Sequence, residues 1–564
     1  MSRETDVRVD YKLVDITAAA DGALSMPNIQ PFSDFTELLD EEQAIRRWAT
    51  VETNAWELDG TMEILPDGIG SVFMGVWSAA MSGDDGAFTA PPVLTATFSK
   101  AHTSGGVTLV FDGVTGDWCS DLNITWYDQD GGQMASKDFT PDSARYFCAD
   151  QVEDYYKLTI TFRKTNKPRR YLKLTGIIYG VTLALGSERL ISCSVLEEAN
   201  PISSEVSVNT LTLSFHTEQG TFDLLDLTGA YVLFQQRQRA DVTGWIDGME
   251  MNMGTFYLDK PTTTESLVTV DCIDLLGTMD DTEYLGGYWS DGITAQNMIA
   301  DIMQSAHIEP EQYTIADSLK SVTVRGYLAI QTHRAALQQV AFAIGAVVDC
   351  SRSDCINITP AKTANPKTVP VSRKVVGHEQ TQDALVTGVE VFTHNYALGE
   401  RSGELFKETR QPGDYLIQFS SPAAGLSITG GTITESGVNY ARIHVPSAGD
   451  VVISGTSYED TQSLAGSVYM ESLPANAKVN IVTVSECTLT TDAQALAQRV
   501  YSYYQRRITD NGQIILATEQ AGDWLAVQTT NGKTLVGTAE QISIDLTGGF
   551  IAKVVTHGTG QSDL

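Results

Sequence analysis

The feature that most constrains this chain is the brevity of its strand-like runs, which turn residues separate at regular intervals. Residues 94–98, 107–111 and 122–127 are runs rich in apolar and β-branched side chains. Between such runs lie turns rich in Gly, Asp, Ser and Pro, of which residues 128–132 are an example. Short strands at this spacing predict a β-sandwich of the jelly-roll type over residues 41–180.

Strand patterns of the same kind recur along the chain, whose 564 residues are too many for one hydrophobic core. Thr, Ser, Gly, Val and Tyr recur throughout, a composition that favours strands and turns over long helices. We therefore predict a mainly β, multidomain protein. The predicted segments are an N-terminal strand segment at 1–40, the jelly roll at 41–180, β domains at 181–289 and 381–490, a small α+β unit at 290–380, and a helix with a β-barrel portion at 491–564.

Within the β domain at 181–289, four runs are predicted to be strands. They are residues 210–215, 231–234, 253–258 and 267–273, and the last two are expected to form a hairpin.

The α+β unit is predicted from two helical patterns. Thr294 is placed as the N-cap of a helix at 295–306, where apolar residues recur on one face. Thr332 is placed as the N-cap of a second helix that ends before Gly345, a residue suited to the C′ position. A third helix is predicted at 491–507.

The formal net charge of −34 limits the partners of this chain. So negative a field disfavours binding to nucleic acid phosphates and to anionic membrane surfaces. No apolar run is long enough to span a membrane, and the N-terminus has no apolar signal core. The seven cysteines include no CxxC pair, so we expect reduced thiols and synthesis in a cytoplasm.

Sequence patterns of common catalytic and metal sites are missing. The eight histidines form neither an HExxH nor an HxH motif, and the chain has no GxSxG elbow and no GxxxxGK[ST] phosphate loop. We therefore predict no catalytic residue, no metal site and no cofactor. Carboxylates are abundant, however, so a glycoside hydrolase that uses two of them stays open as an alternative.

Aromatic residues of the jelly roll are the best candidates for binding, because sugar rings stack on exposed aromatic side chains. Trp118 lies in a turn-like stretch and is the strongest candidate. Trp77 and Tyr127 are the other two predicted glycan-binding residues.

Two stretches in the second half of the chain carry a resemblance. In the first, Arg334-x-x-Leu337-x-x-x-Ala341 is followed by Gly345 and by a strand pattern at 346–360. In the second, a helical pattern precedes Gly522-Asp-x-x-x-Val527. Both are similar to segments of phage tail-hub proteins of the siphophage type, in which the glycine-closed helix precedes a hairpin. The resemblance covers residues 181–564.

Residues 49–60, together with residues 73–78, look like the opening of a galactose-binding-like jelly roll. Modules of this fold are often inserted in tail proteins of phages of Gram-positive hosts, although the functions of the fold vary.

These resemblances imply a structural virion protein at the tip of a phage tail. Such a hub is expected to be a homotrimer that closes the tail tube, to contact the distal tail protein, the tape measure protein and receptor-binding proteins, and to hold host cell-wall glycan weakly. Many hubs continue into a peptidase or glycan hydrolase, but residues 181–564 leave no stretch for one, so we expect no enzyme activity. Arg334 is expected to form a structural ion pair. A carbohydrate-binding adhesin or distal tail protein without a hub role remains the alternative.

Overall fold

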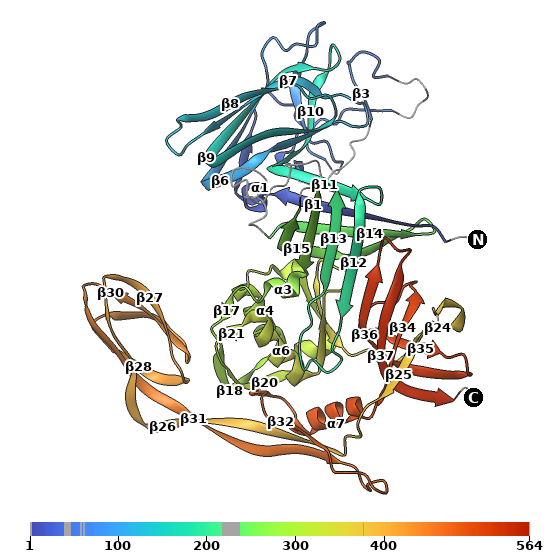
Figure 1. The fold of residues 1–564 in the computed structure, drawn as a ribbon. Helices are drawn as coiled ribbons and strands as arrows, with labels where there is room; N and C mark the ends of the chain where they lie inside the picture. Colours follow the sequence, from blue (N-terminus) through green and yellow to red (C-terminus); the bar gives the residue numbers. More distant parts are fainter. Residues whose placement is uncertain are drawn as a thin grey trace.

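The computed structural model describes residues 3–38, 47–56, 59, 62–70, 72–216, 237–264, 266–375 and 377–562. Within these ranges the chain is mainly β and multidomain, as the sequence predicts. Figure 1 shows a jelly roll at one end, a large sheet and an α+β unit in the middle, and a long two-stranded arm at the other end.

The large sheet combines strands from both halves of the chain. Its order is β11-β1-β14-β15-β16-β13-β12-β36-β37-β34-β25, and β35 pairs with both β36 and β24. The antiparallel pair of β12 and β36 joins the two halves. The bounds are β1 Thr5–Val14, β11 Gly180–Gly186, β12 Leu190–Glu198, β13 Thr210–His216, β14 Arg239–Ile246, β15 Met249–Thr263, β16 Leu267–Ile273, β24 Lys367–Val369, β25 Glu379–Gln382, β34 Ile508–Ile515, β35 Trp524–Gln528, β36 Lys533–Asp545 and β37 Ile551–Ser562.

The N-terminal strand is an inner strand of this sheet. Val7, Val9 and Tyr11 alternate with polar residues, and all three are buried in the core of the sheet. β1 pairs with β14 on one side and with β11 on the other. Because β1 and β11 are neighbours in the sheet, everything between them in the sequence is an insertion. The predicted hairpin of β15 and β16 is present, whereas the strand predicted at 231–234 lies outside the described residues.

The insertion holds the jelly roll, whose strands are ordered β5-β10-β6-β9-β7-β8, with β2 also paired to β6. Register shifts between the long strands β6 and β9 bend the sheet around a core that includes Trp126, Phe111 and Phe162. The bounds are α1 Ile16–Asp21, β2 Ala23–Ser25, η1 Phe35–Glu37, β3 Trp48–Ala49, β4 Glu63–Ile64, β5 Val76–Met81, β6 Val93–Phe111, β7 Cys119–Tyr127, β8 Gln133–Phe139, β9 Arg145–Thr165 and β10 Tyr171–Ile178.

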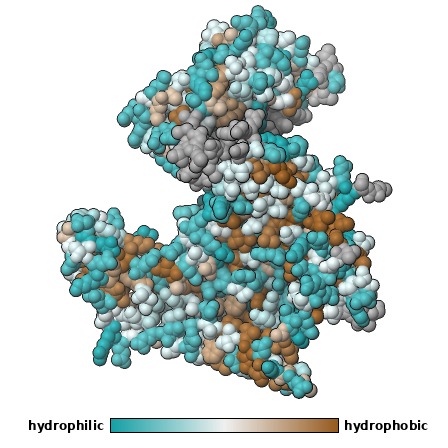
Figure 2. Space-filling model, in the orientation of Figure 1, coloured by the Kyte–Doolittle hydropathy of each residue, from teal (hydrophilic) through white to brown (hydrophobic). Residues whose placement is uncertain are grey.

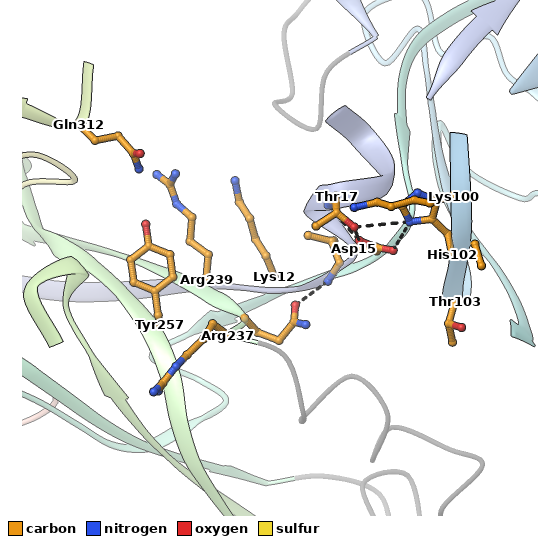
Figure 3. Close-up of a pocket in the computed structure, with 13 residues that line it drawn as sticks. Lys12, Asp15, Thr17, Lys100, His102, Thr103, Arg237, Arg239, Tyr257 and Gln312 are labelled. Carbon is orange, nitrogen blue, oxygen red and sulfur yellow. Dashed lines mark hydrogen bonds and ion pairs between the residues drawn. The ribbon is translucent and has the colours of Figure 1, made fainter. Parts of the chain in front are cut away.

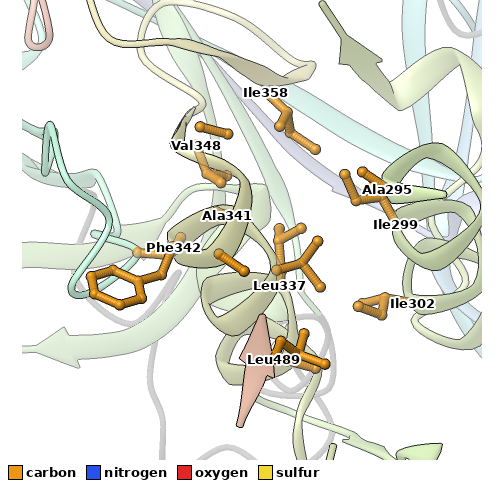
Figure 4. Packing of buried hydrophobic residues seen from close by; sticks show 14 of the residues in the cluster. Ala295, Ile299, Ile302, Leu337, Ala341, Phe342, Val348, Ile358 and Leu489 are labelled. Atoms are coloured by element: carbon orange, nitrogen blue, oxygen red, sulfur yellow. The ribbon is translucent and has the colours of Figure 1, made fainter. Parts of the chain in front are cut away.

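Two helices pack face to face in the α+β unit. α4 (Ala295–Ser305) and α6 (His333–Ile344) bury Ile299, Ile302, Leu337 and Ala341 against each other and the neighbouring strands (Figure 4). The other bounds are α3 Leu275–Thr278, β17 Glu283–Tyr284, β18 Gly287–Thr294, η2 Pro310–Gln312, β19 Tyr313–Ile315, α5 Asp317–Lys320, β20 Thr323–Leu328, β21 Gln331–Thr332, β22 Ala346–Asp349, β23 Ile356–Pro360 and η3 Val371–Arg373.

The predicted ends of both helices are observed. The hydroxyl of Thr294 accepts a hydrogen bond from Asn297 N, and that of Thr332 accepts one from Ala335 N. Gly345 follows α6 in the left-handed conformation, with φ +76°. The third helix, α7 (Ala493–Tyr504), is shorter than predicted at both ends, and the carboxylate of Asp492 caps its start.

The arm differs from its sequence prediction. Residues 381–490 are predicted to hold short strands, yet β26 (Gly388–Arg410) and β31 (Gly449–Tyr469) are long antiparallel partners. Bulges in their pairing bend them, and a small core formed by their distal ends and four further strands caps the arm. The remaining bounds are β27 Gly413–Gln418, β28 Ala423–Thr429, β29 Thr432–Ser436, β30 Tyr440–Val445, β32 Ile481–Val484 and β33 Leu489–Thr490.

Exposed apolar side chains gather where the arm joins the rest of the chain. Leu464, Tyr469, Leu473, Val479 and Ile481 are all exposed. Figure 2 shows brown surface at this lower end of the molecule, where β32 and α7 lie in Figure 1. Soluble monomers seldom expose apolar side chains in groups, so this surface is suited to contact with another protein.

Candidate functional site

The three predicted glycan-binding residues lie in different parts of the jelly roll. Trp118 precedes β7, is half-buried, and donates its indole N–H to Pro141 O at 3.1 Å. Tyr127 lies at the opposite end of β7, with the ammonium of Lys157 4.8 Å from its ring centre. Trp77 is buried on β5 and donates to Met74 O at 2.8 Å. Trp118 and Tyr127 are therefore apart, and of the three only Trp77 lines the cavity described next.

A cavity of about 410 Å³ opens at one end of the jelly roll, and we call it the Lys173 cavity. Five segments of the insertion meet there: a loop at 47–55, strand β5, the turn at 112–117, the loop at 167–170 and strand β10. Its lining is formed by Arg47, Trp48, Thr50, Glu52, Asn54, Ala55, Trp77, Asp112, Val114, Thr115, Asp117, Lys167, Arg170 and Lys173.

Lys173 is the centre of the charged network in this cavity. Its side chain is 2% exposed, and its ammonium lies 2.9 Å from a carboxylate oxygen of Glu52 and 2.9 Å from one of Asp117. The same ammonium lies 4.9 Å from the ring centre of Trp77. A buried lysine needs such partners, because desolvation of an unpaired charge costs several kcal/mol, on the order of the net stability of a domain.

Asp117 pairs with two further cations of the cavity. Its Oδ1 accepts hydrogen bonds from Lys167 at 3.0 Å and from Arg170 Nε at 3.2 Å. Burial alone would raise the pKa of Asp117, but the charge and hydrogen bonds of Lys173, with that of Lys167, lower it below its ordinary value. Asp117 is therefore an anion that holds the loop at 167–170 against the turn at 112–117.

Asp112 is the carboxylate with the opposite shift. It is buried at the start of the turn, where it accepts hydrogen bonds from the backbone of Val114 and Thr115. Burial raises its pKa, and the hydrogen bonds from Thr115 and the charge of Lys173, 3.8 Å away, only partly oppose this.

Glu52 attaches the loop at 47–55 to the sandwich. Its carboxylate accepts hydrogen bonds from Thr50 Oγ1 at 2.7 Å and from Tyr171 N at 2.9 Å. The sequence gives a partial signal for this site, because residues 164–170 are the most basic stretch of the chain. What the sequence does not reveal is that Glu52, Asp112 and Asp117 face that loop, since this depends on the fold.

A second cavity, of about 640 Å³, lies at the junction of the jelly roll and the large sheet (Figure 3). Lys12, Lys100, Arg237 and Arg239 contribute cationic side chains to its lining. Most of these cations are paired: Arg237 contacts Asp259 and Asp281, and Arg239 contacts Asp241. The junction cavity is therefore less basic than its cations suggest.

Other predictions about sites can be placed. Arg334 forms the expected ion pair, with Nη2 2.6 Å from Asp280 Oδ2. All seven cysteines are free. In the described residues, no three His, Cys, Asp or Glu side chains gather as a metal site requires. Among the helices that the structure describes, none is long and apolar enough to cross a membrane.

Comparisons with known proteins find similarity to solved structures alone. No family model matches the sequence, and no curated protein matches it. The tail protein from Neisseria meningitidis MC58 is similar in structure at 10% identity, with a TM-score of 0.38 over 67% of this chain and 93% of that chain. The prophage MuSo2 43 kDa tail protein from Shewanella oneidensis gives 10% identity and a TM-score of 0.37 over 65% of this chain and 94% of that chain.

A prophage tail protein from Listeria monocytogenes EGD-e also gives 10% identity, with a TM-score of 0.37 over 67% of this chain and 91% of that chain. Likenesses with scores this low do not establish a shared fold or a shared function.

Proposed function

We propose that this chain is a structural virion protein of a phage tail tip, a baseplate hub that closes the tail tube and anchors adsorption proteins. The observation that carries the proposal is the position of the residues that resemble tail hubs. Two of them, Arg334 and Asp523, join separate parts of the fold, as expected of residues with a structural role.

Arg334 and Gly345 are the first of these residues. Arg334 lies at the start of α6, pairs with Asp280 and donates to the backbone carbonyl of Val206 at 2.5 Å. It thus joins the helix to the chain that leads out of the large sheet. Gly345 closes α6 and leads into the antiparallel pair of β22 and β23, the helix-then-hairpin order of the resemblance.

Asp523 is the residue of the second resembling stretch. It is buried at the start of β35, and its carboxylate accepts hydrogen bonds from Lys362 at 2.8 Å and Lys367 at 2.6 Å. The α+β unit is thereby fixed to the C-terminal half of the large sheet. Burial would raise the pKa of Asp523, but the hydrogen bonds of the two lysines lower it, so the carboxylate stays charged.

The exposed apolar residues beside β32 and α7 support an assembled state. As a hub, the chain would form a homotrimer and contact the distal tail protein, the tape measure protein and receptor-binding proteins. The test is light scattering on the purified chain, whose monomer mass is 61.2 kDa. A mass three times larger would support the hub. A monomer that stays monomeric when mixed with the distal tail protein of the same phage would contradict it.

The main alternative is a carbohydrate-binding adhesin or distal tail protein without a hub role. The inserted jelly roll has a polar cavity, which favours a glycan-binding role of the insertion whether the chain is a hub or an adhesin. Immunogold labelling of intact virions would distinguish the hub from the adhesin. Antibodies against a hub should label the tail tip only at the tube axis, whereas antibodies against an adhesin should label the periphery of the tail tip.

We also propose that the chain acts without turnover, in place of the glycoside hydrolase alternative. In the Lys173 cavity each carboxylate is already engaged by ammonium, guanidinium, hydroxyl or backbone donors. Prolonged incubation with purified cell-wall polysaccharide should release no reducing ends. Release that a single Asp112→Asn substitution abolishes would overturn this proposal.

A further inference from the structure

We propose that the Lys173 cavity binds one uncharged sugar ring, a hexopyranose or an N-acetylhexosamine, through its hydroxyl groups. The inference deepens the glycan-binding part of the proposed function and rests on it for its biological meaning. The proposed site does not include Trp118 or Tyr127, because neither side chain lines this cavity.

The size of the cavity suits a sugar ring. Its volume of about 410 Å³ lies in the range of small-molecule sites, about 300–1,000 Å³. Trp48 and Trp77 both contribute to its lining. Both indoles are buried, and the ammonium of Lys173 lies over the ring of Trp77, so the accessible lining is mainly polar and would hold the ligand by hydrogen bonds.

The balance of charge in the lining argues for a neutral ligand. Arg47, Lys167, Arg170 and Lys173 face Glu52, Asp112 and Asp117, so cations and anions nearly cancel in a chain whose net charge is −34. A phosphate or carboxylate would meet three acidic side chains, and a metal ion would meet four basic ones. A hydroxyl group both donates and accepts, so it can bond to carboxylates and to cations at once.

The polar groups are held in place before any ligand arrives. Asp117 accepts from Lys167, Arg170, Lys173 and Thr115, all within 3.2 Å. Side chains fixed in this way lose little further freedom on binding, which favours affinity for small ligands.

Two groups in the lining keep hydrogen-bonding capacity. Arg170 uses Nε for Asp117 and Nη1 for Arg169 O, and its Nη2 makes no hydrogen bond within the part of the chain that the structure describes. The side-chain amide of Asn54 is likewise without a hydrogen bond to any described residue. Arg170 can thus donate to a sugar oxygen, and Asn54 can both donate and accept.

The test uses the full-length chain and a panel of uncharged sugars. The probes are methyl glycosides of glucose, galactose, mannose and rhamnose, together with N-acetylglucosamine and N-acetylgalactosamine. Saturation-transfer NMR detects contact, and calorimetric titration gives the Kd. At least one probe should bind in the millimolar range or more tightly. If no probe binds at 20 °C when it is present at roughly ten times a millimolar Kd, the proposal is wrong.

A matched pair of variants locates the site. Arg170→Gln removes the guanidinium that lines the cavity and should weaken binding at least tenfold. Arg169→Gln makes the same change one residue earlier, where the side chain pairs with Asp84 outside the cavity, and should leave the Kd unchanged. Equal losses in both variants would overturn the proposal.

A second variant distinguishes the loss of a sugar contact from misfolding of the protein. Asn54 has φ +59°, so Asn54→Gly deletes the amide without straining the backbone. It should weaken sugar binding with no change in thermal unfolding. Binding that Trp118→Ala or Tyr127→Ala abolishes while Asn54→Gly spares it would place the site elsewhere. Binding of glucuronate or glycerol 3-phosphate in place of the neutral probes would also refute the proposal.

The oligomeric state separates this inference from the proposed function. Light scattering of Arg170→Gln should give the same mass as the parent chain. A sugar-binding chain that stays monomeric when mixed with the distal tail protein of the same phage would contradict the hub but not the sugar site, and a trimer that binds no probe would do the reverse.

Discussion

Arg352 reaches across the molecule to Glu197, a fully buried carboxylate on β12, with Nε 2.6 Å from Oε1. Arg352 follows β22 in the α+β unit, and its Nη2 also donates to Glu519 O, in the C-terminal half of the chain, at 2.5 Å. Glu197 Oε2 accepts from Ala521 N at 3.1 Å. Two residues therefore tie the α+β unit to both halves of the large sheet.

Removal of Arg352 should be severely destabilising. Arg352→Met leaves the Glu197 carboxylate buried without its counter-ion, a change that costs about 3–5 kcal/mol in other buried pairs. Chemical denaturation followed by tryptophan fluorescence measures the loss. Because Arg352 has φ +53°, Met adds no backbone strain that Arg lacks.

The double variant Arg352→Met with Glu197→Gln supplies the control for that experiment. It removes the buried charge together with its partner, so much of the lost stability should return. If the double variant is as unstable as the sum of the two single variants, the two side chains do not act as a pair.

Asp274 should make stability fall as pH rises. It is buried at the N-cap of α3, and burial raises its pKa to about 7, although backbone N–H groups of Asn209 and Gly277 favour its charged form. The folded chain therefore binds more protons than the unfolded chain between about pH 4 and 7. The free energy of unfolding should decrease across this interval and level off above it.

Asp274→Asn is the variant that tests this pH dependence. Its amide oxygen can accept one of the two backbone hydrogen bonds, its NH2 group cannot accept the other, and the group cannot ionise. The free energy of unfolding of the variant should therefore stay level between pH 5 and pH 8, while that of the parent chain falls by about 2–4 kcal/mol. Denaturation curves at pH 5 and pH 8 give the comparison, and equal slopes with pH in both proteins would contradict the assigned protonation.

Features that depend on neighbours in the sequence were predictable. The two N-caps, Thr294 and Thr332, and the closing Gly345 all act within one helical turn, so a local pattern suffices to find them. The ion pair of Arg334 was also expected, although its partner Asp280 could not be named because 54 residues separate the two.

Features that depend on distant segments were not predictable. β1 pairs with β14, whose residues lie more than 200 positions later, and no periodicity in either strand specifies the other. The arm was expected as short strands, because bulges at positions such as Leu398 interrupt the alternation that would mark β26 as one strand. The Lys173 cavity was missed for a similar reason, since its carboxylates come from two separate segments, at Glu52 and at 112–117.

Substitution of Gly345 should lower the stability of the protein for two separable reasons. Its φ of +76° disfavours any side chain, and an added Cβ would collide with Nη1 of Arg499, which anchors α7 to the end of α6. Gly345→Ala should cost more than the roughly 1 kcal/mol of backbone strain alone.

Gly549→Ala is the matched control for Gly345, because φ is +81° there and an added Cβ meets nothing within 4 Å. Thermal unfolding of the two variants isolates the contact with Arg499 as the difference between them. If both variants lose the same stability, the close approach of Arg499 has no energetic weight.

His102 should hold the jelly roll against the segment that follows strand β1. Its Nδ1 lies 2.9 Å from Asp15 and its Nε2 lies 3.1 Å from Asp21, and the side chain is 2% exposed. Hydrogen bonds from Ser99 and then His102 lower the pKa of Asp21, so this stabilisation is present above the ordinary carboxyl pKa and is lost as pH falls below it.

His102→Phe keeps the ring and removes both hydrogen bonds, so it should loosen α1 and residues 15–22 while the sandwich core stays folded. Hydrogen exchange measured by mass spectrometry should show faster exchange in that segment. His444→Phe is the control, because the ion pair of His444 with Asp414 is exposed and surface pairs contribute at most about 1 kcal/mol. Unchanged exchange at 15–22 in His102→Phe would mean that the hydrogen bonds which the backbone N–H groups of Thr17 and Ala18 donate to the Asp15 carboxylate suffice to hold α1.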